Sequence, residues 1–313
     1  MKVKRLINLA LAVVFVSSSF SAGIIPNTTK NSGAVLVAVA DEETTDGNDS
    51  LVVGDFVPDE EYSALVAQKE EFAENYYALK SSGNYAEAKA LLNSANAMFS
   101  TNPTETQTFA TPSTFTASYT MKRLATLGQR PQQTNFWCGY AAMESLLDYD
   151  YQDVTQTQIA NWTYSPSLAC PWYLSNGNST SQFPVAVVLT EKIGFTYLPY
   201  PYGGVGATTL VSSNIKDKIT ATIDQNHGVL ALGTSRKNKS NGTEDASHFY
   251  GYPINTDISH WVAIDGYASS GNTIWIVDPA KSPAVTWSDN ISAYQSVSIE
   301  KLTAFAQTHG IIW

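Results

Sequence analysis

The residues of this chain best suited to covalent chemistry are a cysteine and a histidine far apart in the sequence. Cys138 is one of only two cysteines in 313 residues. It stands where the irregular segment "QQTNFW" gives way to the apolar run "CGYAAMESLLDY", which predicts a helix that begins at the cysteine. The free N–H groups and the positive dipole end at such a helix start stabilise a sulfur anion. This position therefore indicates a thiol nucleophile.

A thiol nucleophile needs a base and a group that orients the base. All four histidines follow Cys138 in the sequence: His227, His248, His260 and His309. The best candidate base is His260, at the start of a predicted strand in "SHWVAIDGY", and Asp278 ends the next predicted strand in "WIVDPA". A tight turn at 269–271 would pair the two strands and bring these ends together. Asp278 could then hold the imidazole in one tautomer.

The segment before the cysteine supplies a fourth candidate group. Gln132 lies six residues and Gln133 five residues upstream of Cys138. A side-chain amide from this segment and the backbone N–H of Cys138 could together form an oxyanion hole. Either glutamine could be the donor.

The elements that must position these residues are predicted from hydrophobic periodicity. Helices are expected over 138–148, 155–163, 183–193 and 209–225, and strands over 227–234, 259–268 and 272–280. Helices followed by antiparallel strands predict an α+β domain, with a helical half and a sheet half.

The N-terminal third has a different organisation. Residues 58–100 show two helical patterns separated by "SSGN", which predicts an αα-hairpin. Residues 101–120 contain eight threonines and two prolines and read as a linker. One hairpin cannot bury its own apolar face. It either packs on the following domain or serves as a pro-segment or spacer.

The first residues predict export. Three basic side chains precede an apolar run and then small residues, the pattern of a secretory signal over 1–23, with a second possible cleavage site near residue 40. Residues 24–57 form an acidic segment expected to be flexible. The formal net charge of −10 argues against a nucleic-acid partner, and no membrane association is expected after signal cleavage. We expect a secreted protein.

Taken together, "QQTNFWCGYAA", "HWVAIDGY" and "IVDPA" resemble the C39-like family of papain-fold cysteine peptidases. The resemblance covers roughly residues 125–310, within a domain taken as 121–313. It implies a papain-like fold with Cys138 as nucleophile, His260 as base, Asp278 as orienting acid and Gln132 as oxyanion donor. Tyr140 stands where the family usually has proline, a departure that affects the wall of the site.

Other interpretations remain open at this point. Cys138 could be a buried structural thiol or form a disulfide with Cys170. The domain could also be a catalytically silent binding or surface module, or a transamidase that passes the acyl group to an amine. No cysteine and histidine spacing typical of a metal site is present, and no cofactor is expected. The expected partner is a peptide or protein substrate.

Overall fold

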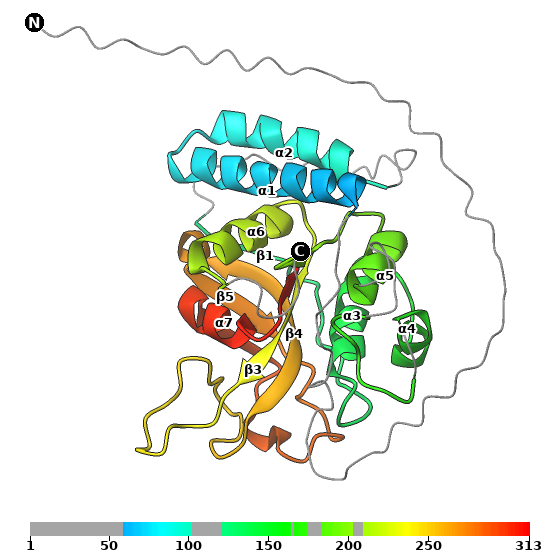
Figure 1. The fold of residues 1–313 in the computed structure, drawn as a ribbon, viewed down its shortest axis with the longest axis vertical. Coiled ribbons are helices and arrows are strands. Elements are labelled where there is room, and N and C mark those ends of the chain that lie inside the picture. Colours follow the sequence, from blue (N-terminus) through cyan, green and yellow to red (C-terminus); the bar gives the residue numbers. More distant parts are fainter. Residues whose placement is uncertain (1–58, 102–119, 164–165, 175–182, 203–208) are drawn as a thin grey trace, which may run out of the picture. The chain divides into compact units, whose positions relative to one another are not determined.

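The computed structural model describes residues 59–101, 120–163, 166–174, 183–202 and 209–313 (Figure 1). All of them lie within one compact unit, residues 43–313. The signal, the acidic segment and nearly all of the threonine-rich linker predicted above fall outside the described residues. The α-helices are α1 (Glu60–Ser81), α2 (Tyr85–Phe99), α3 (Cys138–Tyr149), α4 (Gln156–Thr163), α5 (Pro184–Ile193), α6 (Ser212–Asp224) and α7 (Ile299–Ala306). The strands are β1 (Lys122–Arg123), β2 (Pro199–Tyr200), β3 (Val229–Ser235), β4 (Ile258–Ala268), β5 (Thr273–Val277), β6 (Tyr294–Ser298) and β7 (Gly310–Ile312).

A single antiparallel sheet connects the described strands. Their order is β2-β7-β3-β4-β5-β6, and β1 pairs with β4. The central strands β3 and β4 are buried along nearly their whole length because helices cover both faces. In Figure 1, α3, α4 and α5 lie to one side of these strands and α6 and α7 to the other. The predicted α+β architecture is confirmed.

The helical half is built around α3. Its residues from Cys138 to Met143 are all buried, together with Leu146 and Leu147, so this helix is a core element with little exposed face. It packs on β3 and β4 and against α4 and α5. The nucleophile candidate is therefore attached to one of the most rigidly packed elements of the domain.

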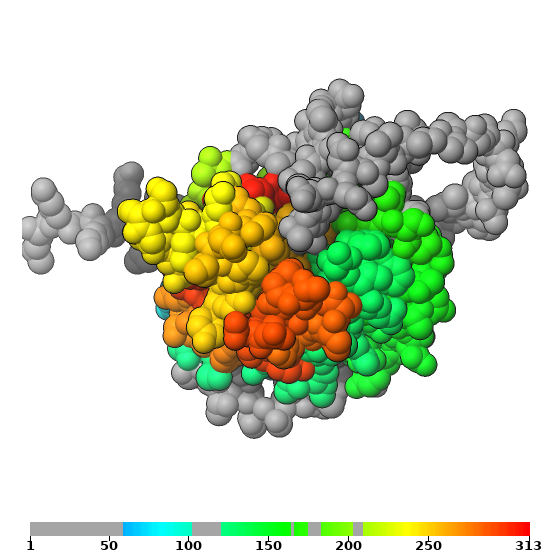
Figure 2. All heavy atoms as spheres, turned by 90° about the horizontal axis from the view of Figure 1, so that it is seen from below, coloured from blue at the N-terminus to red at the C-terminus, as the bar shows by residue number. Residues whose placement is uncertain are grey.

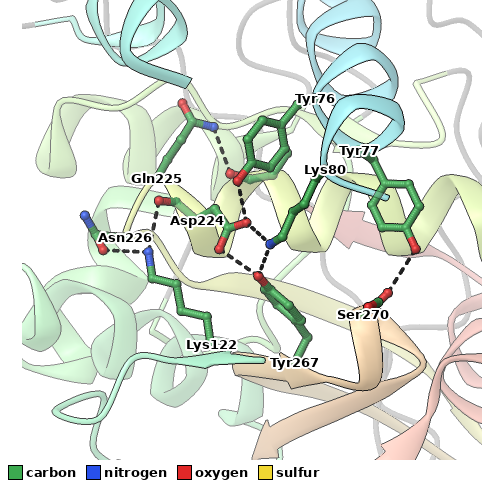
Figure 3. Close-up of polar contacts among 10 residues, drawn as sticks. Tyr76, Tyr77, Lys80, Lys122, Asp224, Gln225, Asn226, Tyr267 and Ser270 are labelled. Atoms are coloured by element: carbon green, nitrogen blue, oxygen red, sulfur yellow. Dashed lines mark hydrogen bonds and ion pairs between the residues drawn. The ribbon is translucent and has the colours of Figure 1, made fainter. Parts of the chain in front are cut away.

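The hairpin of α1 and α2 packs on α6 through a buried polar cluster (Figure 3). The carboxylate of Asp224, at the end of α6, accepts hydrogen bonds from Tyr76 at 2.7 Å and Tyr267 at 2.8 Å, and Lys80 Nζ lies 2.5 Å away. Lys122 Nζ donates to the Asp224 backbone carbonyl at 2.9 Å. Tyr76 and Lys80 of α1 are thus both bound to α6, and Lys80 also contacts the Tyr267 hydroxyl of β4.

A second buried contact of the hairpin involves Lys69. Its Nζ donates to the carbonyls of Thr196 and Trp313, each at 2.5 Å, and lies 4.7 Å and 4.4 Å from the ring centroids of Phe195 and Trp313. Burial, reinforced by the nearby Lys218, holds the pKa of Lys69 well below its usual range.

Within the described part of the chain, no helix is both long and apolar enough to cross a bilayer.

Candidate active site

The imidazole of His260 and the carboxylate of Asp278 are in direct contact. His260 Nε2 lies 3.0 Å from Asp278 Oδ1, and both side chains are buried, at 1% and 0% exposure. Asp278 Oδ1 also accepts from the backbone N–H of Ala280 at 2.9 Å. The structure therefore brings together the two residues that the sequence assigned to the base and its orienting acid.

Strand register explains how two residues 18 positions apart meet. In the β4–β5 ladder Ala263 pairs with Val277, so one further step would set Asp278 opposite Val262. His260, two residues from Val262, is then the diagonal neighbour of Asp278 on the same face of the sheet, within reach of a long side chain. Asp278 itself follows the end of β5, one residue beyond the strand.

Cys138 is the first residue of α3, as predicted, and its side chain is buried at 7% exposure. The N-cap residue is Trp137, whose side chain makes no capping hydrogen bond, and the first turn contains no acidic residue. A typical N-cap side chain would occupy one of the free N–H groups of that turn. Here the amides and the helix dipole remain available to a negative charge at the sulfur or on a bound substrate.

The charge of His260 is coupled to Cys138. Burial lowers the pKa of His260, but the sulfur of Cys138 and the carboxylate of Asp278 outweigh burial and raise the pKa to about 10. A hydrogen bond between the His260 and Cys138 side chains contributes to this rise. Since Nε2 is engaged by Asp278, the ring nitrogen directed at the sulfur is Nδ1. The arrangement favours a protonated imidazole beside the sulfur.

Cys170 is a thiol of a different kind. Both cysteines are free, so the disulfide considered from the sequence does not form. Burial raises the pKa of Cys170 well above its usual range, with a further contribution from Cys138. Cys170 packs against Gly139, where an added Cβ would come within 2.4 Å of the Cys170 Cβ. Cys170 is therefore an inert buried thiol beside the helix start.

Gln132, and not Gln133, points into the protein. Gln132 is 2% exposed, whereas Gln133 is exposed and donates its backbone N–H to Gln156 Oε1 at 3.0 Å. Gln132 Nε2 donates to the Thr134 carbonyl at 2.7 Å, which fixes the orientation of the amide because only its nitrogen, and not its oxygen, can donate to a carbonyl. One further N–H of that amide is available for an oxyanion.

The loop that carries Gln132 is joined to the segment after Asp278. The Gln132 backbone N–H donates to the Pro279 carbonyl at 3.0 Å, and Ser282 Oγ donates to the Gln132 carbonyl at 2.5 Å. These two bonds tie the candidate oxyanion donor to the loop of the candidate orienting acid. One backbone bond and one serine side chain thus hold the Gln132 loop of the helical half against the segment that follows β5.

Three residues near the site were missed from the sequence. Tyr252 donates its hydroxyl to Asp278 Oδ2 at 2.8 Å, and Gln295 Nε2 donates to the same oxygen at 3.3 Å. Trp287 packs against the His260 ring with centroids 6.2 Å apart. The only sequence signal for Tyr252 was the aromatic cluster "FYGY" within an otherwise polar stretch.

The other histidines lie away from this cluster. His227 is buried and stacked on Phe195 at 4.1 Å, and burial lowers its pKa to about 3. His248 binds the Arg236 carbonyl through Nδ1 at 2.9 Å. His309 is half-buried and packs edge-on against Trp172.

Asp265, another buried acid of β4, lies away from the His260 ring. It sits at the irregularity in the β4–β5 ladder and is bound by Arg123 Nε at 2.7 Å. It is therefore already paired with Arg123 and lies five residues along β4 from His260. Among the described residues, no group of three or more potential metal ligands is found.

The segments that carry the candidate site meet on one face of the molecule. Figure 2, seen from below relative to Figure 1, shows the yellow β3–β4 loop and the orange segment after β5 beside the green residues of the helical half. The start of α3 and the start of β4 also face this end in Figure 1, whereas the hairpin of α1 and α2 lies at the opposite end of the domain.

Comparison with known proteins identifies the family of the chain. The model of the Peptidase_C39 like family matches residues 126–302, more than half of the chain. The chain belongs to this family. None of the curated proteins matches the sequence. Among solved structures, a protein from Bacillus anthracis assigned to the C39-like peptidases is similar, with 13% identity over 61% of this chain and 96% of that chain and a TM-score of 0.37.

All four candidate residues of this C39-like chain fall within the matched span, and the hairpin of α1 and α2 falls outside it. At the position of the usual proline, Tyr140 is fully buried, and its ring packs edge-on against Trp137 at 5.8 Å. The tyrosine that replaces the family's proline thus packs inside the core, next to the N-terminus of α3.

Proposed function

We propose that this C39-like protein is an exported cysteine peptidase that hydrolyses peptide bonds. Cys138 is the nucleophile, His260 the proton carrier and Asp278 the orienting acid. Gln132 Nε2 and the Cys138 backbone N–H are the oxyanion donors. The substrate is a peptide or protein, and no cofactor takes part.

In the proposed reaction the Cys138 thiolate attacks the carbonyl carbon, and the electron pair of the C=O bond moves to oxygen. The N–H groups of Gln132 and Cys138 stabilise this oxyanion. His260 gives its proton from Nδ1 to the leaving amine, which departs as an acyl-enzyme forms. Neutral His260 then takes a proton from water, which hydrolyses the thioester and frees the sulfur.

The observation that carries the proposal is the position of His260, which is hydrogen-bonded to Asp278 and adjacent to Cys138. A histidine whose only role was packing would lose its positive charge on burial, as His227 does. For His260, the neighbouring Cys138 sulfur and Asp278 carboxylate reverse that effect and raise the pKa to about 10. This favours a charged imidazole next to the sulfur before the reaction begins, and a neighbouring positive charge promotes the thiolate form that acts as the nucleophile.

The test is the reactivity of Cys138 near pH 6. With iodoacetamide, Cys138 should react much faster than a model thiol, while Cys170 in the same molecule should stay unmodified and serve as the internal control. Peptide mass spectrometry separates the two sites. Hydrolysis of a mixed peptide library should disappear in Cys138→Ala. Slow alkylation together with hydrolysis that survives in Cys138→Ala would refute the proposal.

The alternatives give different products. A transamidase would yield an amide with an added primary amine in place of the free acid, and a silent module would yield neither product. Product analysis by mass spectrometry, with and without the amine, separates the three functions.

For the hairpin we propose a structural role in preference to a removable pro-segment. The supporting contacts are the buried pairs of Lys80 with Asp224, beside Tyr267 at the far end of β4 from His260, and of Lys69 with two backbone carbonyls. The strand from His260 to Tyr267 is seven residues long, so the Lys80–Asp224 pair lies about 23 Å along β4 from the candidate site.

Export is tested separately by determining the N-terminus of the protein recovered from culture medium.

A further inference from the structure

Four donors surround the carboxylate of Asp278. His260 Nε2 and the Ala280 backbone N–H take Oδ1, at 3.0 and 2.9 Å, and the Tyr252 hydroxyl and Gln295 Nε2 take Oδ2, at 2.8 and 3.3 Å. A carboxylate held through one oxygen can rotate about its last torsion, because that torsion is soft. Donors on both oxygens fix its plane, and with it the direction from which His260 is bound.

Of the two donors to Asp278 Oδ2, Tyr252 makes the shorter hydrogen bond and is the more deeply buried. Its side chain is 3% exposed, and its ring lies edge-on to His260 with centroids 5.8 Å apart and packs on Trp287 at 5.2 Å. One side chain thus contacts both the acid and the imidazole. Gln295, on β6 at the edge of the sheet, is only half-buried.

The local backbone explains how a loop residue reaches this position. Tyr252 lies in the long connection between β3 and β4, directly after Gly251, whose φ is +85°. A Cβ at Gly251 would come within 2.4 Å of the Asn290 carbonyl oxygen. The glycine therefore permits both the left-handed turn and the close approach of this loop to the segment after β5, and Tyr252 is directed at Asp278 as a result.

We propose that Tyr252 is a positioning residue of the site: its hydroxyl fixes the Asp278 carboxylate, and through it the His260 ring beside Cys138. The β3–β4 loop is then a working part of the active site. The inference rests on the proposed function, since it assigns a role toward the same thiol and imidazole.

The experiment measures the second-order rate of Cys138 alkylation by iodoacetamide at pH 6, which needs no substrate. Tyr252→Phe removes only the hydroxyl and keeps the ring, so the packing on His260 and Trp287 is retained. We expect the rate to fall about tenfold, the scale of a hydrogen bond to a charged group. Tyr197→Phe is the matched control, because Tyr197 is also buried and its hydroxyl donates to the Gly228 carbonyl at 3.2 Å, away from the site.

The same change in an Asp278→Asn background separates positioning from a general effect on structure. If Tyr252 acts through Asp278, the two changes are not additive, and Tyr252→Phe should alter the rate less than twofold in that background. Gln295→Leu removes the other donor on Oδ2 and should slow alkylation by a smaller factor. It also provides an independent reading if Tyr252→Phe lowers the melting temperature. With a peptide substrate, the loss should appear in kcat and not in KM.

Two outcomes would overturn the inference without touching the proposed function. One is a Tyr252→Phe protein that alkylates at the wild-type rate, and the other is an equal tenfold loss in the Asp278→Asn background. A wild-type Cys138 no faster than a model thiol would overturn the proposed function itself, and the role of Tyr252 with it.

Discussion

Replacement of Lys80 by methionine tests how firmly the N-terminal hairpin is bound. Lys80 and Asp224 form an ion pair with Nζ–Oδ2 at 2.5 Å, and their side chains are 9% and 6% exposed. Methionine keeps most of the apolar volume of lysine and removes the charge. Asp224 would then stay buried without its nearest cation.

Removing one partner of a buried ion pair destabilises a protein by about 3–5 kcal/mol. We expect the lower end of that range, because Tyr76 and Tyr267 continue to donate to the Asp224 carboxylate. About 3 kcal/mol corresponds to a melting temperature lower by about 6–12 °C in a protein of this size. Adding Asp224→Asn should cost less than the sum of the two single changes, because the double variant has no unpaired carboxylate.

The measurement is equilibrium urea unfolding of the single and double variants, with Lys237→Met as the control on an exposed lysine. The control should change the free energy of unfolding by no more than about 0.5 kcal/mol. Cys138 alkylation per folded molecule should be unaffected by Lys80→Met. A loss below 1 kcal/mol would refute the reasoning about the buried pair, and higher peptidase activity would favour the pro-segment over the structural role.

Three further predictions concern packing, pH and the hairpin as a whole. Gly139→Ala should destabilise the fold by about 1–3 kcal/mol in urea unfolding and slow Cys138 alkylation, because the added Cβ would collide with Cys170. Adding Cys170→Gly should partly restore the stability and the alkylation rate. A Gly139→Ala protein with unchanged stability would contradict this prediction. Burial raises the pKa of Asp150 to about 7, so folding is penalised increasingly as pH rises from the unfolded value near 4 to 7. Asp150→Asn should therefore stabilise the protein by about 1–3 kcal/mol at pH 8 and have little effect at pH 3, and equal effects at both pH values would contradict the assignment. Removal of residues 41–120 should lower the melting temperature without raising peptide hydrolysis, and a rise in hydrolysis would contradict the structural role.

The main elements and the candidate pair of His260 and Asp278 could be predicted because each depends on local sequence. The helix starting at Cys138, the two strands and the short connection between them are readable from period and turn residues. The register of the β4–β5 hairpin then follows from the position of the turn that joins the two strands. Even the irregularity at Asp265 leaves this end of the ladder undisturbed, since it lies beyond the pairs nearest His260.

What could not be predicted depends on contacts between distant segments. Tyr252 and Gln295 reach Asp278 from a loop and from an edge strand, and neither position carries a local signal of that contact. Strand β7 has three residues and is held by β2 and β3, so its pairing is entirely long-range. The burial of Lys69 could not be predicted either. A lysine within a helical pattern is expected to be exposed to water, but the side chain of Lys69 is fully buried.

The binding of the hairpin also has a consequence for the order of folding. Tyr76 and Asp224 are 148 residues apart, and Lys69 and Trp313 are 244 apart. During synthesis, α1 is the first described helix to leave the ribosome, yet its partners on α6, β4 and β7 follow much later. Such distant contacts form slowly, after local helices and hairpins. The hairpin is therefore among the first elements to be made and the last to reach its final contacts, and a chain interrupted before β7 would leave Lys69 without the Trp313 carbonyl, one of its two hydrogen-bond acceptors.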